Sequence, residues 1–347
     1  MSDELNPSGV SRKGLLFGLP YQKENAELVL IPVPWEVTTS YGAGTSKGPK
    51  AILEASNQVD LSLKAIFEPW NFKVAMQDVP EPIRQISKRL KSKAKQIIDY
   101  LEQKGPDLPP DLVAVQQEIN QACEDLNEQI YKNAKSIIAE GKIPAILGGE
   151  HSSPLGLMKA LSEHHEFGVL QIDAHMDLRA SYEGFKYSHA SIMRNAIDLP
   201  GVKSITPIGI RDFCQEEIDF IEESDKEINV YFDEDLQARQ FNGETFSEII
   251  HLLIATLPDK VYISFDIDGL DPSLCPNTGT PVPGGLSFNQ AYFILLMLVQ
   301  SGRTIIGFDL CEVSPGKDEW DANVGARMLY RLTSLTGVSN GFLEFAE

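Results

Sequence analysis

The stretch Val261-Tyr262-Ile263-Ser264-Phe265-Asp266-Ile267-Asp268 joins a run of apolar residues to two acidic residues on alternate positions. Its apolar beginning, rich in β-branched and aromatic side chains, is typical of a strand that is covered on both faces. Alternate residues at the end of a strand point the same way, so Asp266 and Asp268 are expected to converge.

The same pattern occurs earlier in the chain, in Gln171-Ile172-Asp173-Ala174-His175-Met176-Asp177, again after an apolar run. Here an aspartate, a histidine and a second aspartate hold the alternate positions. A third segment, Gly148-Gly149-Glu150-His151-Ser152, also follows an apolar run and supplies one more histidine.

Four carboxylates and a histidine gathered at one place repel each other strongly unless cations lie among them. With the second histidine they form a set of hard and borderline ligands, which suits two divalent metal ions better than one. The candidate ligands are His151, Asp173, His175, Asp177, Asp266 and Asp268. The sequence therefore predicts a binuclear metal site.

Short apolar runs alternate with helical stretches along most of the chain. This alternation predicts an α/β fold, a three-layer α/β/α sandwich around a mostly parallel sheet of about eight strands. The expected strands lie near residues 28–32, 73–76, 144–147, 168–172, 204–209, 228–232, 261–265 and 304–308. Ligands in such folds bind at the carboxyl ends of the strands, where all three motifs lie.

The segment from residue 81 to 141 has a different pattern, in which apolar residues recur every three or four positions. It predicts two amphipathic helices, separated by the glycine and prolines of 105–110 and closed by Gly141. The surface of the first helix carries a basic patch: Arg84, Lys88, Arg89, Lys91, Lys93 and Lys95. This patch is either a solvated helix face or a contact with a neighbouring subunit.

The domain organisation follows from these patterns. We expect a single catalytic domain over residues 26–347, which includes the helical pair at 81–141. Residues 1–25, rich in Ser, Gly and Lys, are expected to form an N-terminal arm. Such arms are often poorly ordered unless they dock on a neighbour.

Composition narrows the class of protein. The chain has 347 residues and a formal net charge of −20. This charge disfavours nucleic acid as a partner, because binding a phosphate backbone requires a basic surface. No apolar run approaches the roughly 20 residues that span a membrane, and the polar N-terminus is unlike a signal peptide. The four scattered cysteines favour reduced thiols in a cytoplasmic protein.

Taken together, the motifs resemble those of the ureohydrolase superfamily, which includes arginase and agmatinase. The resemblance rests on residues 148–152, 173–177 and above all 264–285, which contain Asp266-Ile267-Asp268-Gly269-Leu270-Asp271-Pro272. Residues 40–52 and 312–315 match as well. The resemblance covers about residues 28–335 and implies an arginase-like fold.

The resemblance implies a centre of two Mn²⁺ ions, with Ni²⁺ as the alternative, since both metals accept aspartate and histidine ligands. By the matching motifs, Asp173 and Asp266 would bridge the metals, His151 and Asp177 would complete one metal, and His175 and Asp268 the other. In this family a hydroxide between the metals attacks the guanidinium carbon, and urea and an amine are released. The family also implies assembly into trimers or hexamers.

Three residues match catalytic positions of the family. Asp177 would also hydrogen-bond the hydroxide and pass its proton to the leaving nitrogen. Glu312 would hold the guanidinium group through forked, charge-assisted hydrogen bonds. His189 would carry protons at the mouth of the cleft, a task that suits the ordinary pKa of histidine.

The loop from Asp177 to His189 is similar to the agmatinase branch and lacks the stretch with which arginases bind the amino-acid end of arginine. The expected partner is therefore a small cationic guanidino compound without that end, and the expected activity is that of an agmatinase. Segment 318–327 departs from many agmatinases and leaves guanidinobutyrase and guanidine hydrolase open. Trp320 either reaches the pocket, where it would shorten it or stack on a guanidinium, or packs at a subunit contact.

Two other classes of function are open on the residues alone. One is a metal-dependent deacylase or phosphoesterase on a related α/β fold, against which the complete two-metal ligand set argues. The other is a catalytically inactive, metal-binding assembly protein, for which an incomplete ligand set is expected.

Overall fold

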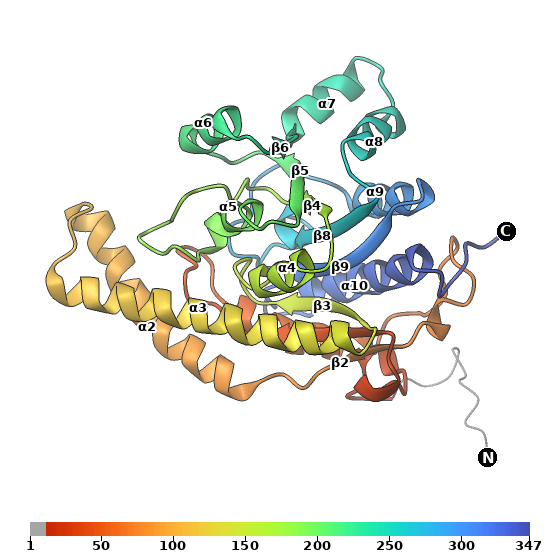
Figure 1. The fold of residues 1–347 in the computed structure, drawn as a ribbon, viewed down its shortest axis with the longest axis horizontal. Coiled ribbons are helices and arrows are strands. Elements are labelled where there is room, and N and C mark those ends of the chain that lie inside the picture. The colour runs from red at the N-terminus through yellow and green to blue at the C-terminus, as the bar shows by residue number, and fades with distance from the viewer. Residues whose placement is uncertain (1–11) are drawn as a thin grey trace.

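A single parallel sheet runs through the molecule, and the computed structural model describes residues 12–347 (Figure 1). Its nine strands lie in the order β2-β1-β3-β9-β8-β4-β5-β6, with β7 paired to β5 as well. The strands are β1 Leu28–Val33, β2 Val74–Met76, β3 Ile143–Gly148, β4 Phe167–Ile172, β5 Val202–Ile210, β6 Glu227–Ile228, β7 Tyr231–Phe232, β8 Lys260–Asp266 and β9 Thr304–Cys311. Each strand pairing in this sheet is parallel, so the predicted α/β fold is confirmed.

Helices cover both faces of the sheet, because alternate residues of the central strands are apolar on both sides. In β1, Leu28 and Leu30 join one core, and Val29 and Ile31 join the other. The first core is closed by α1 (Gly48–Ser56), α8 (Phe246–Ala255), α9 (Phe288–Gln300) and α10 (Trp320–Ser339). The second is closed by α2 (Glu81–Lys104), α3 (Pro110–Ala139), α4 (Leu155–Ser162) and α5 (Ile192–Ile197). The three predicted layers are therefore present.

The edge of the sheet differs from the prediction. The single strand expected at 228–232 is two short strands, β6 and β7, which pair with successive parts of β5. The pairing of β5 with β7 contains a register shift between Ile208 and Ile210. Gly209 lies at this shift with a φ of 94°, a backbone conformation that residues with a Cβ rarely adopt.

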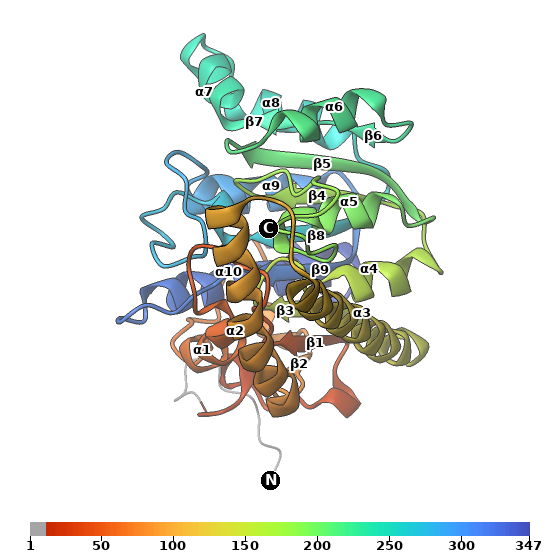
Figure 2. The same ribbon diagram turned by 90° about the vertical axis from the view of Figure 1, so that its left-hand side faces the viewer.

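The two helices predicted between residues 81 and 141 are α2 and α3, which lie at the end of the molecule that holds β1 and β2 (Figure 2). Gly105, with a φ of 95°, ends α2, and Pro110 opens α3, where its missing N–H costs nothing. At the opposite end lie α6 (Gln215–Glu223) and α7 (Asp233–Phe241).

The beginning of the described chain packs against the body of the fold. Leu16, Phe17 and Leu19 are buried, and the ring of Phe17 meets that of Tyr330 edge to face at 4.8 Å. Residues 1–11 of the expected N-terminal arm lie outside the described residues. None of the helices in residues 12–347 combines the length and the apolar character needed to cross a membrane.

Candidate active site

The three motifs meet because they follow strands that lie close together in the sheet. His151 follows β3, the residues from Asp173 to Asp177 follow β4, and Asp268 follows β8. Strand β8 lies between β4 and β9, and β9 pairs with β3. Since all of these strands are parallel, their carboxyl ends open on one edge of the sheet. The structure brings all six candidate metal ligands together there.

The first group surrounds His151. Its Nδ1 atom lies 3.0 Å from Asp177 Oδ2, 3.1 Å from Asp173 Oδ2 and 3.3 Å from Asp266 Oδ2. All four side chains are buried. The ligand atoms of His151, Asp173 and Asp266 lie within 4.8 Å of one another, close enough to share one ion.

The second group surrounds His175. Its Nδ1 atom lies 3.2 Å from Asp268 Oδ2 and 3.6 Å from Asp173 Oδ1. Asp173 thus presents one oxygen to each histidine and belongs to both groups. An arrangement of two ligand groups that share a carboxylate fits a pair of cations.

Local hydrogen bonds set the shape of both acidic motifs. The N–H of His175 donates to Asp173 Oδ1 at 2.7 Å, and the N–H of Asp268 donates to Asp266 Oδ1 at 2.9 Å. In each motif the aspartate turns the chain back at the end of its strand, as such side chains do in Asx-turns. The N–H of Ala174 also donates to Asp268 Oδ1 at 3.1 Å and joins the two motifs.

The charge of the cluster is unbalanced. Burial and the neighbouring charge of Asp173 raise the pKa of Asp177 to about 7. Burial also raises the pKa of Asp266 well above its ordinary value, and the charges of Asp268 and Asp173 add to this effect. These carboxylates gain from any cation placed among them.

A buried ring nitrogen without a hydrogen-bond partner tests whether a divalent metal fits this cluster. Nδ1 of His151 is buried and forms no hydrogen bond to any described residue, although buried polar atoms are nearly always paired. A ring nitrogen that faces three carboxylate oxygens is a common donor set for a divalent transition metal. The residues present therefore fit the metal centre.

A relay of hydrogen bonds behind the cluster fixes the protonation of this ring. The Ser264 hydroxyl donates to Asp309 Oδ2 at 2.8 Å, so its oxygen is left to accept from His151 Nε2, also 2.8 Å away. A proton on Nε2 leaves the lone pair of Nδ1 directed at the acidic groups. Tyr262 supports the relay with a hydrogen bond of 2.9 Å to Asp309.

This relay was not predicted from the sequence. Its signal is present all the same, because Asp309 is a charged residue inside the apolar run of β9. Buried charges of this kind are kept only where they have partners.

Glu312 follows β9 and turns toward the cluster with a φ of 61°, a strained value for a residue with a Cβ. Its Oε1 accepts the N–H of His151 at 2.8 Å, whereas its buried Oε2 has no hydrogen-bond partner among the described residues. Burial, helped by the charge of Glu150, raises the pKa of Glu312 to about 8. The carboxylate therefore has a free acceptor beside the cluster.

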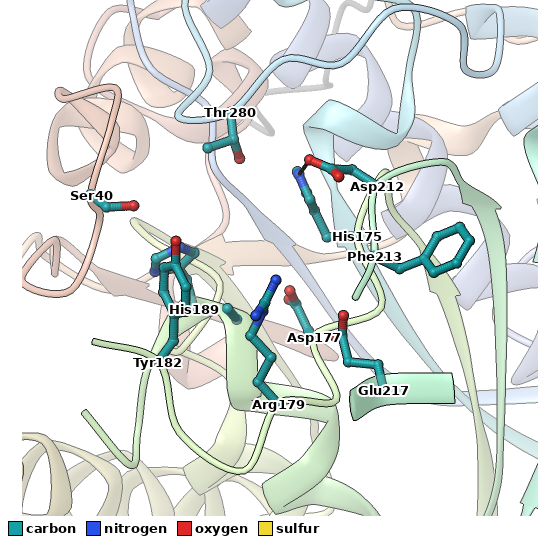
Figure 3. Close-up of a pocket in the computed structure, with 11 residues that line it drawn as sticks. Ser40, His175, Asp177, Arg179, Tyr182, His189, Asp212, Phe213, Glu217 and Thr280 are labelled. Atoms are coloured by element: carbon teal, nitrogen blue, oxygen red, sulfur yellow. Dashed lines mark ion pairs between the residues drawn. The ribbon is translucent and has the colours of Figure 1, made fainter. Parts of the chain in front are cut away.

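A cavity of about 120 Å³ opens above His175 and Asp177 (Figure 3). Its walls come from the loops that follow several strands and include Ser40, Asp212 and Thr280. The cavity therefore borders the acidic cluster through His175 and Asp177.

His189 lies in the wall of this cavity, with its ring 5.8 Å from that of Tyr182 and nearly perpendicular to it. Its Nδ1 lies 3.2 Å from the Thr38 hydroxyl. Burial lowers the pKa of His189 to about 3. The ring is therefore neutral at pH 7, and its pKa lies below the ordinary histidine value on which its predicted role in proton transfer was based.

Arg179, at this cavity, had no predicted role in binding, whereas Trp320 was predicted either to reach the pocket or to pack at a subunit contact. Arg179 lines the cavity and points into it beside Asp177 (Figure 3), with its guanidinium 5.0 Å from the ring of Tyr182. Trp320, in contrast, is not part of this wall. Its indole N–H donates to the carbonyl of Ser273 at 2.9 Å, and the residue is 46% exposed.

Comparisons with known proteins agree with this geometry. The N(1)-aminopropylagmatine ureohydrolase of Synechocystis sp. is 30% identical over 318 residues, which cover 91% of this chain and 90% of that protein. The enzyme of the same name from Thermococcus kodakarensis is 32% identical over 296 residues, 85% of each chain. The agmatine ureohydrolase of Thermoplasma volcanium has a similar structure, with a TM-score of 0.70, 25% identity and coverage of 93% and 94% of the two chains. A model of the Arginase family matches residues 26–334. The chain therefore belongs to the arginase family, as a ureohydrolase with relatives of the agmatinase type.

Proposed function

We propose that this ureohydrolase acts on agmatine or its N(1)-aminopropyl derivative and releases urea and an amine at a centre of two Mn²⁺ ions. The observation that carries the proposal is that Asp173 is shared by two groups of metal-ligating side chains beneath one small cavity. The names of the relatives point to the same class of substrate, since they are ureohydrolases of agmatine and aminopropylagmatine.

The six clustered residues would hold the two cations. His151 and Asp177 would bind one and His175 and Asp268 the other, while Asp173 and Asp266 contribute to both. When bound, two such cations supply a water molecule whose pKa is lowered toward neutrality, and they polarise the bond under attack. Ni²⁺ is the second choice of metal, because aspartate and histidine ligands accept either ion.

Glu312 would hold the guanidinium group of the substrate. Its free Oε2 is a buried acceptor next to the cluster, and a carboxylate forms short, charge-assisted hydrogen bonds with guanidinium N–H groups. A cation brought close to Glu312 also favours the ionised form of its carboxyl group, which burial disfavours.

Asp177 and His189 would manage the protons. The carboxylate of Asp177 borders both the cluster and the cavity, so it is placed to take a proton at Oδ and give it to the leaving nitrogen. His189 is neutral, with Nδ1 held by Thr38, which leaves Nε2 for proton exchange with solvent.

Guanidinobutyrase activity is the second candidate, and Arg179 is the observation that favours it. A guanidinium that points into the cavity can bind the carboxylate at the far end of a guanidino acid. Asp212, in the opposite wall, would instead favour an amine at that position. The two substrates differ in the charge of the tail and are separated by direct assay.

The test is urea release from a panel of substrates, with the protein loaded with Mn²⁺ or Ni²⁺. The panel contains agmatine, N(1)-aminopropylagmatine, guanidinobutyrate, guanidine and arginine. We expect the highest kcat/KM with one of the first two and little activity with arginine, and we expect Asp268→Asn to abolish urea release. If no compound yields urea with either metal, the proposal is wrong. The expected cytoplasmic location stays a prediction.

A further inference from the structure

Helix α2 contacts the loop that follows β1 through two buried or half-buried side chains. The N–H of Glu36 donates to the hydroxyl of Ser87 at 2.8 Å, and both residues are buried. One helical turn later, the ammonium of Lys91 donates to the Glu36 carboxylate and, at 2.8 Å, to the hydroxyl of Thr39. Residues four apart lie on one face of a helix, so Ser87 and Lys91 form hydrogen bonds with residues 36–39 from the same face of α2.

The pair formed by Lys91 and Glu36 differs from a surface salt bridge. The side chain of Glu36 is 4% exposed and that of Lys91 is 29% exposed. The second oxygen of Glu36 accepts the N–H groups of Gly44 and Ser46 and the Ser46 hydroxyl, each at 3.0 Å. Removing one partner of such a buried pair leaves the other charge uncompensated, which disturbs the structure around it.

A cavity of about 750 Å³ separates α2 from most of this loop, and Glu36, Thr39 and Lys91 are part of its lining. Within residues 12–347, Ser87 and Lys91 supply the hydrogen bonds that cross from α2 to the loop. The position of the loop relative to α2 therefore depends on these two side chains.

The loop of residues 36–39 also contacts His189, through Thr38. The N–H groups of Val37 and Thr38 donate to Glu150 Oε2 at 2.9 and 2.8 Å. The Thr38 hydroxyl lies 3.2 Å from Nδ1 of His189 and also accepts the N–H of His189 at 3.2 Å. Thr38 is thus the link between the loop and the wall of the active site.

We infer that α2 is a positioning element of the active site, in which Lys91 and Ser87 hold Thr38 in place and Thr38 orients the ring of His189. The inference rests on the proposed function, since it assigns Lys91 to the proton transfer that His189 performs there. Loops are the mobile parts of a fold, and a rigid helix that fixes one removes freedom before the reaction begins. A small displacement of a catalytic group is enough to slow the reaction by up to about a hundredfold.

The test compares Lys91→Met with Lys91→Arg and with the control Lys88→Met. Lys88 lies on the same helix and its substitution removes the same charge, but Lys88 is exposed and, among residues 12–347, forms no hydrogen bond or ion pair with residues 36–39. We expect Lys91→Met to lower kcat roughly tenfold to a hundredfold with little change in KM, because the substrate still meets Glu312. Lys91→Arg is expected to keep most of the activity, and Lys88→Met all of it. A kcat of Lys91→Met equal to that of Lys88→Met overturns the inference.

A second readout does not depend on urea release. Amide hydrogen exchange of the metal-loaded protein, followed by mass spectrometry, is expected to quicken in peptides that cover residues 36–46 and 187–191. This change is expected in Lys91→Met and in the milder Ser87→Ala, but not in Lys88→Met. Unchanged exchange in both regions contradicts the inference. If the wild-type protein hydrolyses nothing in the panel, the proposed function fails, while exchange still decides whether Lys91 holds His189.

Discussion

Ser264 and Asp309 are single residues behind the proposed metal ligands, and their hydrogen bonds act on His151. Their hydrogen bonds place the proton of His151 on Nε2 and leave Nδ1 to face the carboxylates. Partners of this kind commonly change metal affinity by about 10- to 100-fold when they are removed.

Ser264→Ala is therefore expected to weaken binding of Mn²⁺ by about 10- to 100-fold. The variant lets the imidazole change tautomer or rotate, because Nε2 loses its acceptor. Isothermal titration of metal-stripped protein measures the effect, with the exposed Ser273→Ala as the control. An affinity equal to that of the control shows that the relay does not set the tautomer.

Glu183 gives a prediction on pH and stability outside the metal cluster. Burial, with the charge of Glu102 acting in the same direction, raises the pKa of Glu183 from 4.5 to about 7, and its Oε2 is buried without a partner among the described residues. Between pH 4.5 and about pH 7 the folded state binds more protons than the unfolded state. The free energy of unfolding therefore falls as the pH rises through this window.

Glu183→Gln is expected to remove this part of the pH dependence, because the amide carries no charge. The free energy of unfolding of the variant minus that of the wild type is therefore expected to be larger at pH 8 than at pH 4.5. Urea denaturation of both proteins at the two pH values measures the difference. A constant difference between wild type and variant across this range contradicts the shifted pKa of Glu183.

At the scale of elements, the apolar runs of the sequence predicted the central strands well, because these strands are buried on both faces. The edge was harder to predict. The strand expected at 228–232 is two short strands, and the second of them pairs with β5 across the register shift at Gly209. The effect of a bulge on a neighbouring strand is not local in sequence. The helical pair was predictable from the three- and four-residue spacing of its apolar residues. The hydrogen bonds of Lys91 to the loop after β1 were not, because they join residues more than 50 positions apart.

Gly209→Ala is expected to destabilise the fold by about 1–2 kcal/mol from backbone strain alone, since its φ is 94°. A Cβ there would also lie 2.9 Å from the carbonyl oxygen of Asp173, which adds to the cost and displaces a proposed metal ligand. Gly302→Ala is the matched control, because its φ is 85° but its Cβ would meet nothing within 4 Å. Urea denaturation measures the free energy of unfolding of both variants. We expect the larger loss in Gly209→Ala, with the m-value unchanged. Equal losses would show that the contact with Asp173 carries no cost.

At the scale of the whole molecule, charge is unevenly distributed. Helix α2, which is rich in basic residues, lies at one end and the acidic helices α6 and α7 at the other, in a chain of net charge −20 (Figure 2). Opposite charges on opposite ends favour contacts between copies of a chain, which is consistent with the trimer or hexamer implied by the family. Light scattering at micromolar concentration is expected to give such an assembly, and a monomer at every salt concentration would contradict it.

The candidate site was easier to predict than its surroundings. Asp173, His175 and Asp177 fall on alternate positions after one strand, so their convergence follows from strand geometry. The relay through Asp309 and the link from Lys91 to His189 depend on side chains from separate elements, and no spacing in the sequence encodes their distances.

The central claim is that one cluster of acids and histidines holds two divalent cations that share Asp173. Titration of metal-stripped protein with Mn²⁺, read by bound metal per chain and by urea release, tests it most directly. We predict two ions per chain in the wild type, with activity rising as the second ion binds, and loss of one of the two ions in His175→Ala. Saturation at a single ion, or full activity with one ion bound, would contradict the claim.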